Sequence, residues 1–204
     1  MAGSTIIFRY IYQKLIYNLE VFIMLEYEKD GKYYIITKEK DINQGVKENP
    51  VFDQKKRLVN VILRKNPEEN YFIDTLKNVK HAHVNYDGFD RGHFIADSLK
   101  PFLLTQDEIR VNKKQVELFF GKGNVDNVSP QSPEANRNSG EFAGQLRFEQ
   151  VILNYLKNSE KDAEVYYEIE EIIIDKDVVL GRRIYIEFLN SNIKNIHVFI
   201  PDVR

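Results

Sequence analysis

Four residues suited to phosphate chemistry stand together in the stretch YDGFDRGHFIADSL, namely Asp90, Arg91, Gly92 and His93. The pKa of an ordinary histidine lies near neutrality, so His93 can accept a proton from water without a large change of environment. Arg91 carries a fixed charge and a fork of donors that matches phosphate oxygens. Gly92 lets the backbone approach a ligand closely, and Asp90 is expected to orient a ring nitrogen or to hold Arg91. Together they suggest phosphate chemistry, although four residues form a short motif.

A second polar stretch, NVSPQSPEANRNSGEFAGQLRFEQ, covers residues 127–150 and is rich in short amides. Asparagine commonly caps helices and forms turns, so amides alone would indicate only a loop. Asn136, however, stands just ahead of the clearest predicted helix, and Glu149 lies on that helix in the same row as apolar residues. We therefore expect the Glu149 carboxylate at the edge of the buried face, pointing into a site.

These residue types are sufficient for hydrolysis assisted by one metal ion. A neutral asparagine oxygen suits a hard cation, and Mg²⁺ prefers few protein ligands because it keeps several of its waters. Such an ion neutralises the charge that develops on a phosphate and on the leaving 3′ oxygen. His93 would then deprotonate a water on the opposite side. The sequence shows no dense cluster of carboxylates, which disfavours a two-metal site.

With DRGH followed by NVSPQSPEANRNSG…FE, the chain resembles the DNA/RNA non-specific endonucleases, the ββα-metal nucleases similar to Serratia nuclease. The resemblance covers residues 86–156 and rests on two motifs in the expected order. It implies an α+β fold in which helices pack on a mostly antiparallel sheet. It also implies hydrolysis of phosphodiester bonds in DNA, with RNA as a second substrate, and Mg²⁺ as the cofactor, for which Mn²⁺ could substitute.

The resemblance also assigns roles to individual residues. His93 corresponds to the general base that activates water, and Asn136 to the protein ligand of a single Mg²⁺. Arg91 would contact the phosphate or stabilise its charge, and Arg137, beside the metal ligand, would help to bind the substrate. Glu149 matches the acidic residue that follows the asparagine on the helix, which implies a catalytic role in holding metal-bound waters.

Two spacings depart from the family pattern. His93 and Asn136 are 43 residues apart, which is wider than the family pattern, and the excess falls in residues 104–123. We interpret that segment as an inserted helix or hairpin that alters the substrate groove. The run from Asn136 to Glu149 is also long, and Glu141 is a nearer carboxylate that stays an alternative. Asn127 is expected to be structural.

The remaining histidines are weaker candidates. His81 and His83, in the sequence HAH, would point to one face of a strand and could form a metal pair. The chain has no cysteine, and no third histidine lies in register, so exposed strand residues are the favoured interpretation. His197 lies in an apolar strand and is expected to be structural.

The elements that must position these residues follow from hydrophobic periodicity. Residues 144–158 predict a helix because apolar residues recur there at i, i+3, i+4, i+7 and i+8. Residues 38–56 predict a loop, and residues 94–104, which contain Pro101, have helical or loop character. Strands are predicted over residues 33–37, 57–65, 78–86, 165–174, 183–188 and 196–200, with a turn near residues 175–181 and the last strand ending at Pro201. The pattern predicts one α+β domain over residues 1–204.

Composition limits the partners more than it identifies them. The chain has 204 residues and a net charge of −2, so contacts with nucleic acid must come from local arginines or a metal ion rather than from a global basic field. The absence of cysteine excludes disulfides, thiolate zinc sites and cysteine nucleophiles.

Residues 1–25 form an apolar N-terminal segment that we interpret as an extension covering its surface against the body or a partner. Arg9, Gln13, Lys14 and Glu20 interrupt residues 6–25, which argues against a membrane span, and no secretory cleavage site is evident. Because a non-specific nuclease endangers its host, a bacterial toxin or effector with an inhibitory immunity protein is a further hypothesis. The alternatives are an inactive nuclease-like binding module and a phosphatase or phosphodiesterase acting on small substrates.

Overall fold

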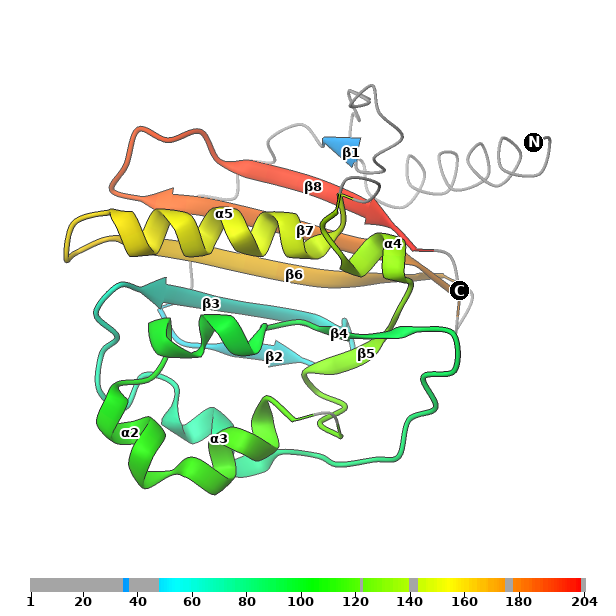
Figure 1. Ribbon diagram of the computed structural model, residues 1–204, viewed down its shortest axis with the longest axis horizontal. Coiled ribbons are helices and arrows are strands. Elements are labelled where there is room, and N and C mark those ends of the chain that lie inside the picture. The colour runs from blue at the N-terminus through cyan, green and yellow to red at the C-terminus, as the bar shows by residue number, and fades with distance from the viewer. Residues whose placement is uncertain (1–34, 37–47, 122, 140–142, 175–177, 203–204) are drawn as a thin grey trace.

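The computed structural model describes residues 35–36, 48–121, 123–139, 143–174 and 178–202 (Figure 1). The apolar segment 1–25, most of the strand predicted over residues 33–37 and the alternative carboxylate Glu141 lie outside these residues. The body is a six-stranded antiparallel sheet with the strand order β1-β8-β7-β6-β3-β2. Its strands are β1 (Ile35–Ile36), β2 (Val51–Asp53), β3 (Leu58–Arg64), β6 (Glu164–Ile174), β7 (Val178–Leu189) and β8 (Ile196–Pro201).

The centre of the sheet confirms the strands predicted from alternation. Strands β6 and β7 form a long antiparallel hairpin, and β8 continues the sheet until Pro201. β7 begins at Val178, so residues 178–181 of the predicted turn belong to a strand, and residues 175–177 lie outside the described residues. The short strand β2 was missed within the loop predicted over residues 38–56. It forms because it pairs with β3 while Phe52 packs against the core.

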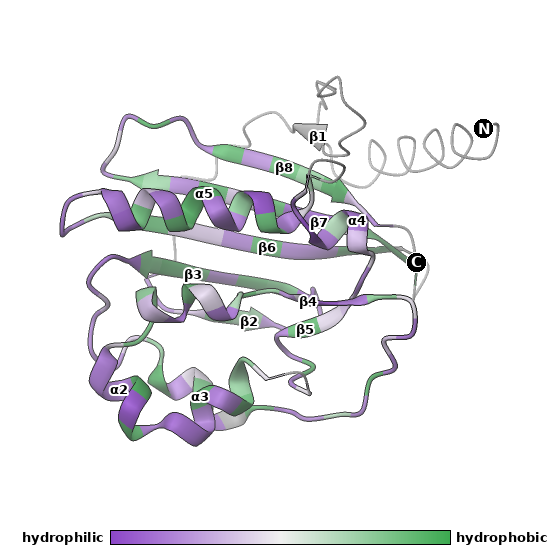
Figure 2. Cartoon of the chain, viewed as in Figure 1, coloured by the Kyte–Doolittle hydropathy of each residue, from purple (hydrophilic) through white to green (hydrophobic). Residues whose placement is uncertain are grey.

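One face of the sheet is covered by helix α5 (Gln145–Asn158), which confirms the predicted helix. Its residues Phe148, Ile152 and Leu156 are buried in the main hydrophobic core, together with inward-facing residues of β6 and β7. Figure 2 shows hydrophilic and hydrophobic residues alternating along α5, as expected for a helix with one buried face. The packing of this buried face holds the N-terminal turn of α5 against the sheet.

The inserted segment is helical. It forms α2 (Gln106–Val111) and α3 (Lys113–Phe119) beside the 3₁₀ helix η2 (Ile73–Asn78) (Figure 1). Thr105 and Glu108 form a capping box at the start of α2. Phe119 packs edge-to-face on Phe72, with ring centroids 5.3 Å apart. The insert thus completes the core at this end of the molecule rather than projecting from it.

A second, two-stranded sheet carries the DRGH motif. Strand β4 (Asp90–His93) pairs with β5 (Val128–Gln131), and the 3₁₀ helix η3 (Asp97–Phe102) and the short helix α4 (Pro133–Asn136) follow these two strands. The strand predicted over residues 78–86 is wrong, because that segment makes only an isolated bridge from His81 to Asn124.

The α+β class with a mostly antiparallel sheet is confirmed. Within the described ranges, none of the helices is both long and apolar enough to cross a membrane.

Candidate functional site

His93 ends strand β4, and its ring is held by the insert. The ring nitrogen Nε2 lies 3.0 Å from the carbonyl oxygen of Phe120, the residue that follows α3. A carbonyl oxygen can only accept a hydrogen bond, so this contact favours the neutral ring with its proton on Nε2 and its lone pair on Nδ1. The Phe120 carbonyl therefore favours Nδ1 as the nitrogen that acts as a base, and the Arg91 carbonyl is a second acceptor near the ring.

The electrostatic surroundings keep this ring neutral. Burial lowers the pKa of His93 below its ordinary value, and the positive charge of Arg182 acts in the same direction. The carbonyls of Phe120 and Arg91 and the carboxylate of Asp97 oppose that shift of the pKa but do not reverse it. A neutral imidazole at neutral pH is the form that a general base requires.

Asn136 is tied to the other end of the same strand. Its Nδ2 donates to Oδ2 of Asp90 at 3.1 Å, which leaves the side-chain oxygen Oδ1 turned away from that carboxylate. Arg137 holds Asp90 with two bonds, from Nε at 2.7 Å and from Nη2 at 2.6 Å. These hydrogen bonds from Arg137, followed by the one from Asn136, lower the pKa of Asp90. Asp90 is thus an ionised acceptor that sets the orientation of the Asn136 amide.

This arrangement corrects the role expected for Asp90. The sequence suggested that its carboxylate orients a histidine ring or holds Arg91. The carboxylate instead binds Asn136 and Arg137, which are 46 and 47 residues away in the sequence. Short-range reasoning favoured partners within the motif, whereas α4 folds back onto the beginning of β4.

Arg91 is exposed and faces a hollow of about 660 Å³ that Asp90 and Asn136 also line. Its guanidinium lies over the ring of Tyr86, 5.3 Å from the centroid. This placement suits the predicted contact with phosphate. Arg137 is 57 % exposed but bound to Asp90, so its guanidinium already has an anionic partner. Whether it also binds the substrate stays a prediction.

Glu149 lies deeper than the sequence predicted. We expected its carboxylate at the edge of the buried face of the helix, but the residue is only 5 % exposed. Its Oε1 accepts a hydrogen bond of 2.7 Å from Nε2 of Gln145. Burial raises the pKa of Glu149 to about 7, against the opposing effects of Gln145 and Arg182. The same Gln145 side chain also donates to the main-chain carbonyl of His93, which links the first turn of α5 to β4. Its role in holding metal-bound waters stays a prediction.

A buried polar network beneath β4 was missed by the sequence reasoning. Its centre is Arg182 of β7, which is fully buried and contacts main-chain carbonyls of β4 as well as Gln145 and Ser129. A usable signal did exist. Adjacent strand residues point to opposite faces, so the pair Arg182–Arg183 must place one arginine toward the helix-covered side of the sheet.

Asn127 has the structural role predicted for it. It is fully buried and its side chain bridges the backbone of Ile95, accepting from the amide at 2.9 Å and donating to the carbonyl at 3.1 Å. Its own carbonyl accepts a hydrogen bond from the amide of Phe94 at 2.7 Å. These bonds fix the segment that follows His93.

The other histidines contribute no metal cluster. His81 and His83 are exposed, although outside any strand, and His197 is buried on the opposite face of the sheet, beside Tyr185. In the part of the chain that the structure describes, no three His, Cys, Asp or Glu side chains gather as a metal site.

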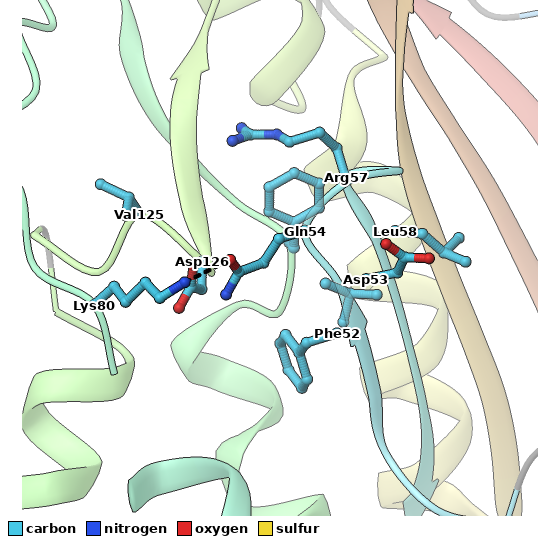
Figure 3. Close-up of a pocket in the computed structure, with 10 residues that line it drawn as sticks. Phe52, Asp53, Gln54, Arg57, Leu58, Lys80, Val125 and Asp126 are labelled. Atoms are coloured by element: carbon cyan, nitrogen blue, oxygen red, sulfur yellow. Dashed lines mark hydrogen bonds between the residues drawn. The ribbon is translucent and has the colours of Figure 1, made fainter. Parts of the chain in front are cut away.

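A second hollow, of about 260 Å³, opens beside the turn between β2 and β3 (Figure 3). Phe52, Leu58 and Phe94 form its apolar wall, and Lys80 donates to Gln54 across it at 2.7 Å. Arg91 and Asn136 are not among its lining residues, so it is separate from the hollow that Arg91 faces, and His93 lines neither of the two hollows.

No protein-family model matches the chain, and no curated protein sequence matches it. Solved structures do match it. NucA from Streptococcus agalactiae with magnesium ion bound superposes with a TM-score of 0.58 and 14 % identity, over 95 % of this chain and 90 % of that one. The same protein with no metal bound gives a TM-score of 0.59 and 15 % identity, over 97 % and 89 %.

This chain has the NucA fold. Identity this low establishes shared architecture and leaves chemistry to be argued from residues. The NucA likeness confirms the antiparallel α+β fold expected from the motifs, without assigning the chain to a sequence family.

Proposed function

We propose that this chain is a Mg²⁺-dependent nuclease that hydrolyses phosphodiester bonds in DNA, with RNA as a second substrate. One observation carries the proposal. Asn136, 43 residues beyond His93 in the sequence, donates a hydrogen bond to Asp90, the first residue of the four-residue strand that His93 ends. The fold shared with NucA, a nuclease with a magnesium-bound structure, supports this reading.

The residues present suit a magnesium ion. Because Asp90 accepts from Nδ2 of Asn136, the side-chain oxygen of the asparagine is oriented as a neutral oxygen ligand, which a hard cation prefers. Asn136 would hold the ion directly, and Glu149 would act on its waters. When bound, Mg²⁺ supplies neutralisation of the charge on the phosphate and on the leaving oxygen.

The protein's own groups supply the remaining chemistry. Nδ1 of His93 accepts a proton from the attacking water, while Nε2–H stays bound to the carbonyl of Phe120. Arg91 contacts the phosphate from the hollow beside β4, and Arg137 keeps Asp90 ionised and in place. Contacts with phosphates rather than base edges would give little sequence preference.

A plasmid-nicking assay, run in parallel on DNA and RNA, tests the proposal. We expect cleavage with Mg²⁺ or Mn²⁺, loss of cleavage with EDTA, and loss in His93→Ala and Asn136→Ala. Asn138→Ala is the matched control, because Asn138 lies two residues away and donates to Gln150 on α5. Inactivity in every divalent metal would instead support a nuclease-like binding module. Cleavage of bis-p-nitrophenyl phosphate without cleavage of the polymers would support a small-substrate phosphodiesterase.

The biological role extends the proposal. An enzyme that cleaves without sequence preference would damage the nucleic acid of the cell that makes it, so we propose a toxin or effector role with an inhibitory immunity protein. Harmless expression of the active protein in the cytoplasm, together with a pull-down from the source cell that recovers no inhibitor, would contradict this role.

A further inference from the structure

Two adjacent arginines on β7 lie on opposite faces of the sheet and serve different partners. Arg183 pairs with Glu168 and Glu170 of the neighbouring strand β6, so its charge is neutralised within the sheet. Arg182 points toward the helix-covered face, where its nearest carboxylate is Glu171, 3.8 Å from Nε. Glu171 is in closer contact with Arg57, at 2.8 Å. Arg182 therefore directs most of its donors elsewhere.

Those donors reach the strand that carries His93. Nη1 of Arg182 lies 3.0 Å from the carbonyl oxygen of His93, and Nη2 lies 3.0 Å from that of Gly92. The same two nitrogens also donate to Oε1 of Gln145 at 2.7 Å and to Oγ of Ser129 at 2.6 Å. Burying a guanidinium is costly unless its donors are satisfied, and here two of its partners are backbone atoms of one short strand.

Gly92 is what allows this approach. A Cβ at position 92 would lie 3.0 Å from Nη2 of Arg182 and 2.3 Å from Oε1 of Gln131. The glycine of the DRGH motif is thus required on its inner side, first by Gln131 and then by the closely approaching arginine, and not only where a ligand would bind.

Helix α5 also contributes a hydrogen bond to the main-chain carbonyl oxygen of His93. Nε2 of Gln145 donates to the carbonyl of His93 at 2.5 Å, so that oxygen accepts from both Arg182 and Gln145. Strand β4 has only four residues and belongs to a two-stranded sheet, an arrangement that is marginally stable by itself. The position of β4 consequently depends on its hydrogen bonds with Arg182 and Gln145.

We propose that Arg182 is a positioning residue, which fixes the main chain at Gly92 and His93 so that the imidazole meets both the Phe120 carbonyl and the attacking water. This inference rests on the proposed nuclease function. Arg182 does not touch the substrate, and it acts through β4.

Kinetics of matched variants provide the first test. Arg182→Met removes the guanidinium, Arg182→Lys keeps the charge but not the fork, and Arg183→Met makes the same change at the adjacent residue on the other face. We expect kcat to fall about 100-fold in Arg182→Met, since misplacement of a reacting group by about 1 Å has that effect. KM should stay within about twofold, and Arg182→Lys should recover part of the rate, because binding is not disturbed and one carbonyl can still be held. Arg183→Met should lose thermal stability and keep its kcat.

A second readout does not need catalysis. In the metal-free protein, NMR of the His93 ring reports its tautomer and pKa, and the charged groups that act on it are Arg182 from β7 and Asp97 from η3. Removing the positive charge should raise the pKa of His93 in Arg182→Met and leave it unchanged in Arg183→Met. If Arg182→Met does not fold, Arg182→Lys and Ser129→Ala keep the positive charge and weaken only the hydrogen bonds to β4 and Ser129, so in these variants the His93 tautomer and kcat are the readouts.

The outcomes separate the two claims. Equal falls of kcat in Arg182→Met and Arg183→Met, or an unaltered His93 ring in Arg182→Met, would overturn the positioning role. An inactive wild type would overturn the nuclease proposal, while the NMR comparison would still decide whether Arg182 controls the ring.

Discussion

The two faces of the six-stranded sheet bury similar side chains and use them differently. On the outer face, Arg183 pairs with carboxylates of the adjacent strand, and the Tyr166 hydroxyl donates to Glu168 at 2.6 Å. On the inner face, Arg182 and Gln145 donate to the backbone of β4, a strand outside that sheet. Polar groups that pair within a sheet stabilise only the sheet. Polar groups that reach a separate strand also determine where that strand lies, and here it carries the candidate base.

The largest difference between the faces should come from their histidines. His93→Ala removes the candidate base, and we expect the cleavage rate to fall by about 10²–10⁴-fold. His197→Gln alters a buried histidine on the outer face, beside Tyr185, and should reduce stability with little change in rate. Plasmid cleavage and thermal unfolding, measured on both variants, check this contrast. An equal loss of cleavage rate in the two variants would contradict the expected difference between the two faces.

The next largest expected effect is the change of folding stability with pH that Glu149 causes. Its folded-state pKa is about 7, above the usual value of 4.5, so the folded state binds more protons between those two pH values. The stabilisation from the protonated carboxyl is complete below pH 4.5 and is lost as pH rises through about 7, which amounts to about 3 kcal/mol. Denaturant unfolding of the metal-free protein between pH 4.5 and 8 should show this slope.

Glu149→Gln should flatten that slope, because the amide does not titrate. Glu170→Gln, a carboxylate that pairs with Arg183 on the outer face, is the matched control and should keep the slope. A wild-type stability that rises over this pH range, after correction with Glu149→Gln, would show that the carboxyl is ionised when buried.

A smaller effect is expected for the carboxylate that orients Asn136. Asp90→Ala removes the acceptor of both Asn136 and Arg137, and we expect activation by Mg²⁺ to weaken by about 10–100-fold, as for other groups that orient a metal ligand. Glu168→Ala removes a carboxylate from Arg183 on the other face and should leave the Mg²⁺ dependence unchanged. Titration of cleavage rate against Mg²⁺ concentration distinguishes them.

The smallest expected effect is the pH dependence of the rate. Burial lowers the pKa of His93 from its ordinary value of 6.5, and the base works only when neutral. The rate should therefore fall only below pH 6.5, and as pH decreases. A rate that already declines between pH 8 and 7 as the solution is acidified would indicate a different base or a raised pKa.

Local pattern was sufficient for most elements of the fold. The apolar stripe of residues 144–158 predicted α5, and alternation predicted β3, β6, β7 and β8. The insert was identified as regular structure from its sequence alone. Prediction failed for β2 and for residues 78–86, because a three-residue edge strand and an extended segment that makes only an isolated bridge have no periodicity of their own.

The sequence by itself determined the candidate base, the amide expected to hold a metal and the cation beside them, because DRGH and the asparagine-rich stretch record residue types and order. The tertiary structure alone decided what those side chains meet. Asp90 binds partners on α4, Glu149 is enclosed, and β4 rests on Arg182, about 90 residues further along the chain. Such contacts depend on how β7, α4 and α5 pack around a short strand. Hydrophobic periodicity in one sequence predicts helices and strands, but it does not predict which distant segments pack together.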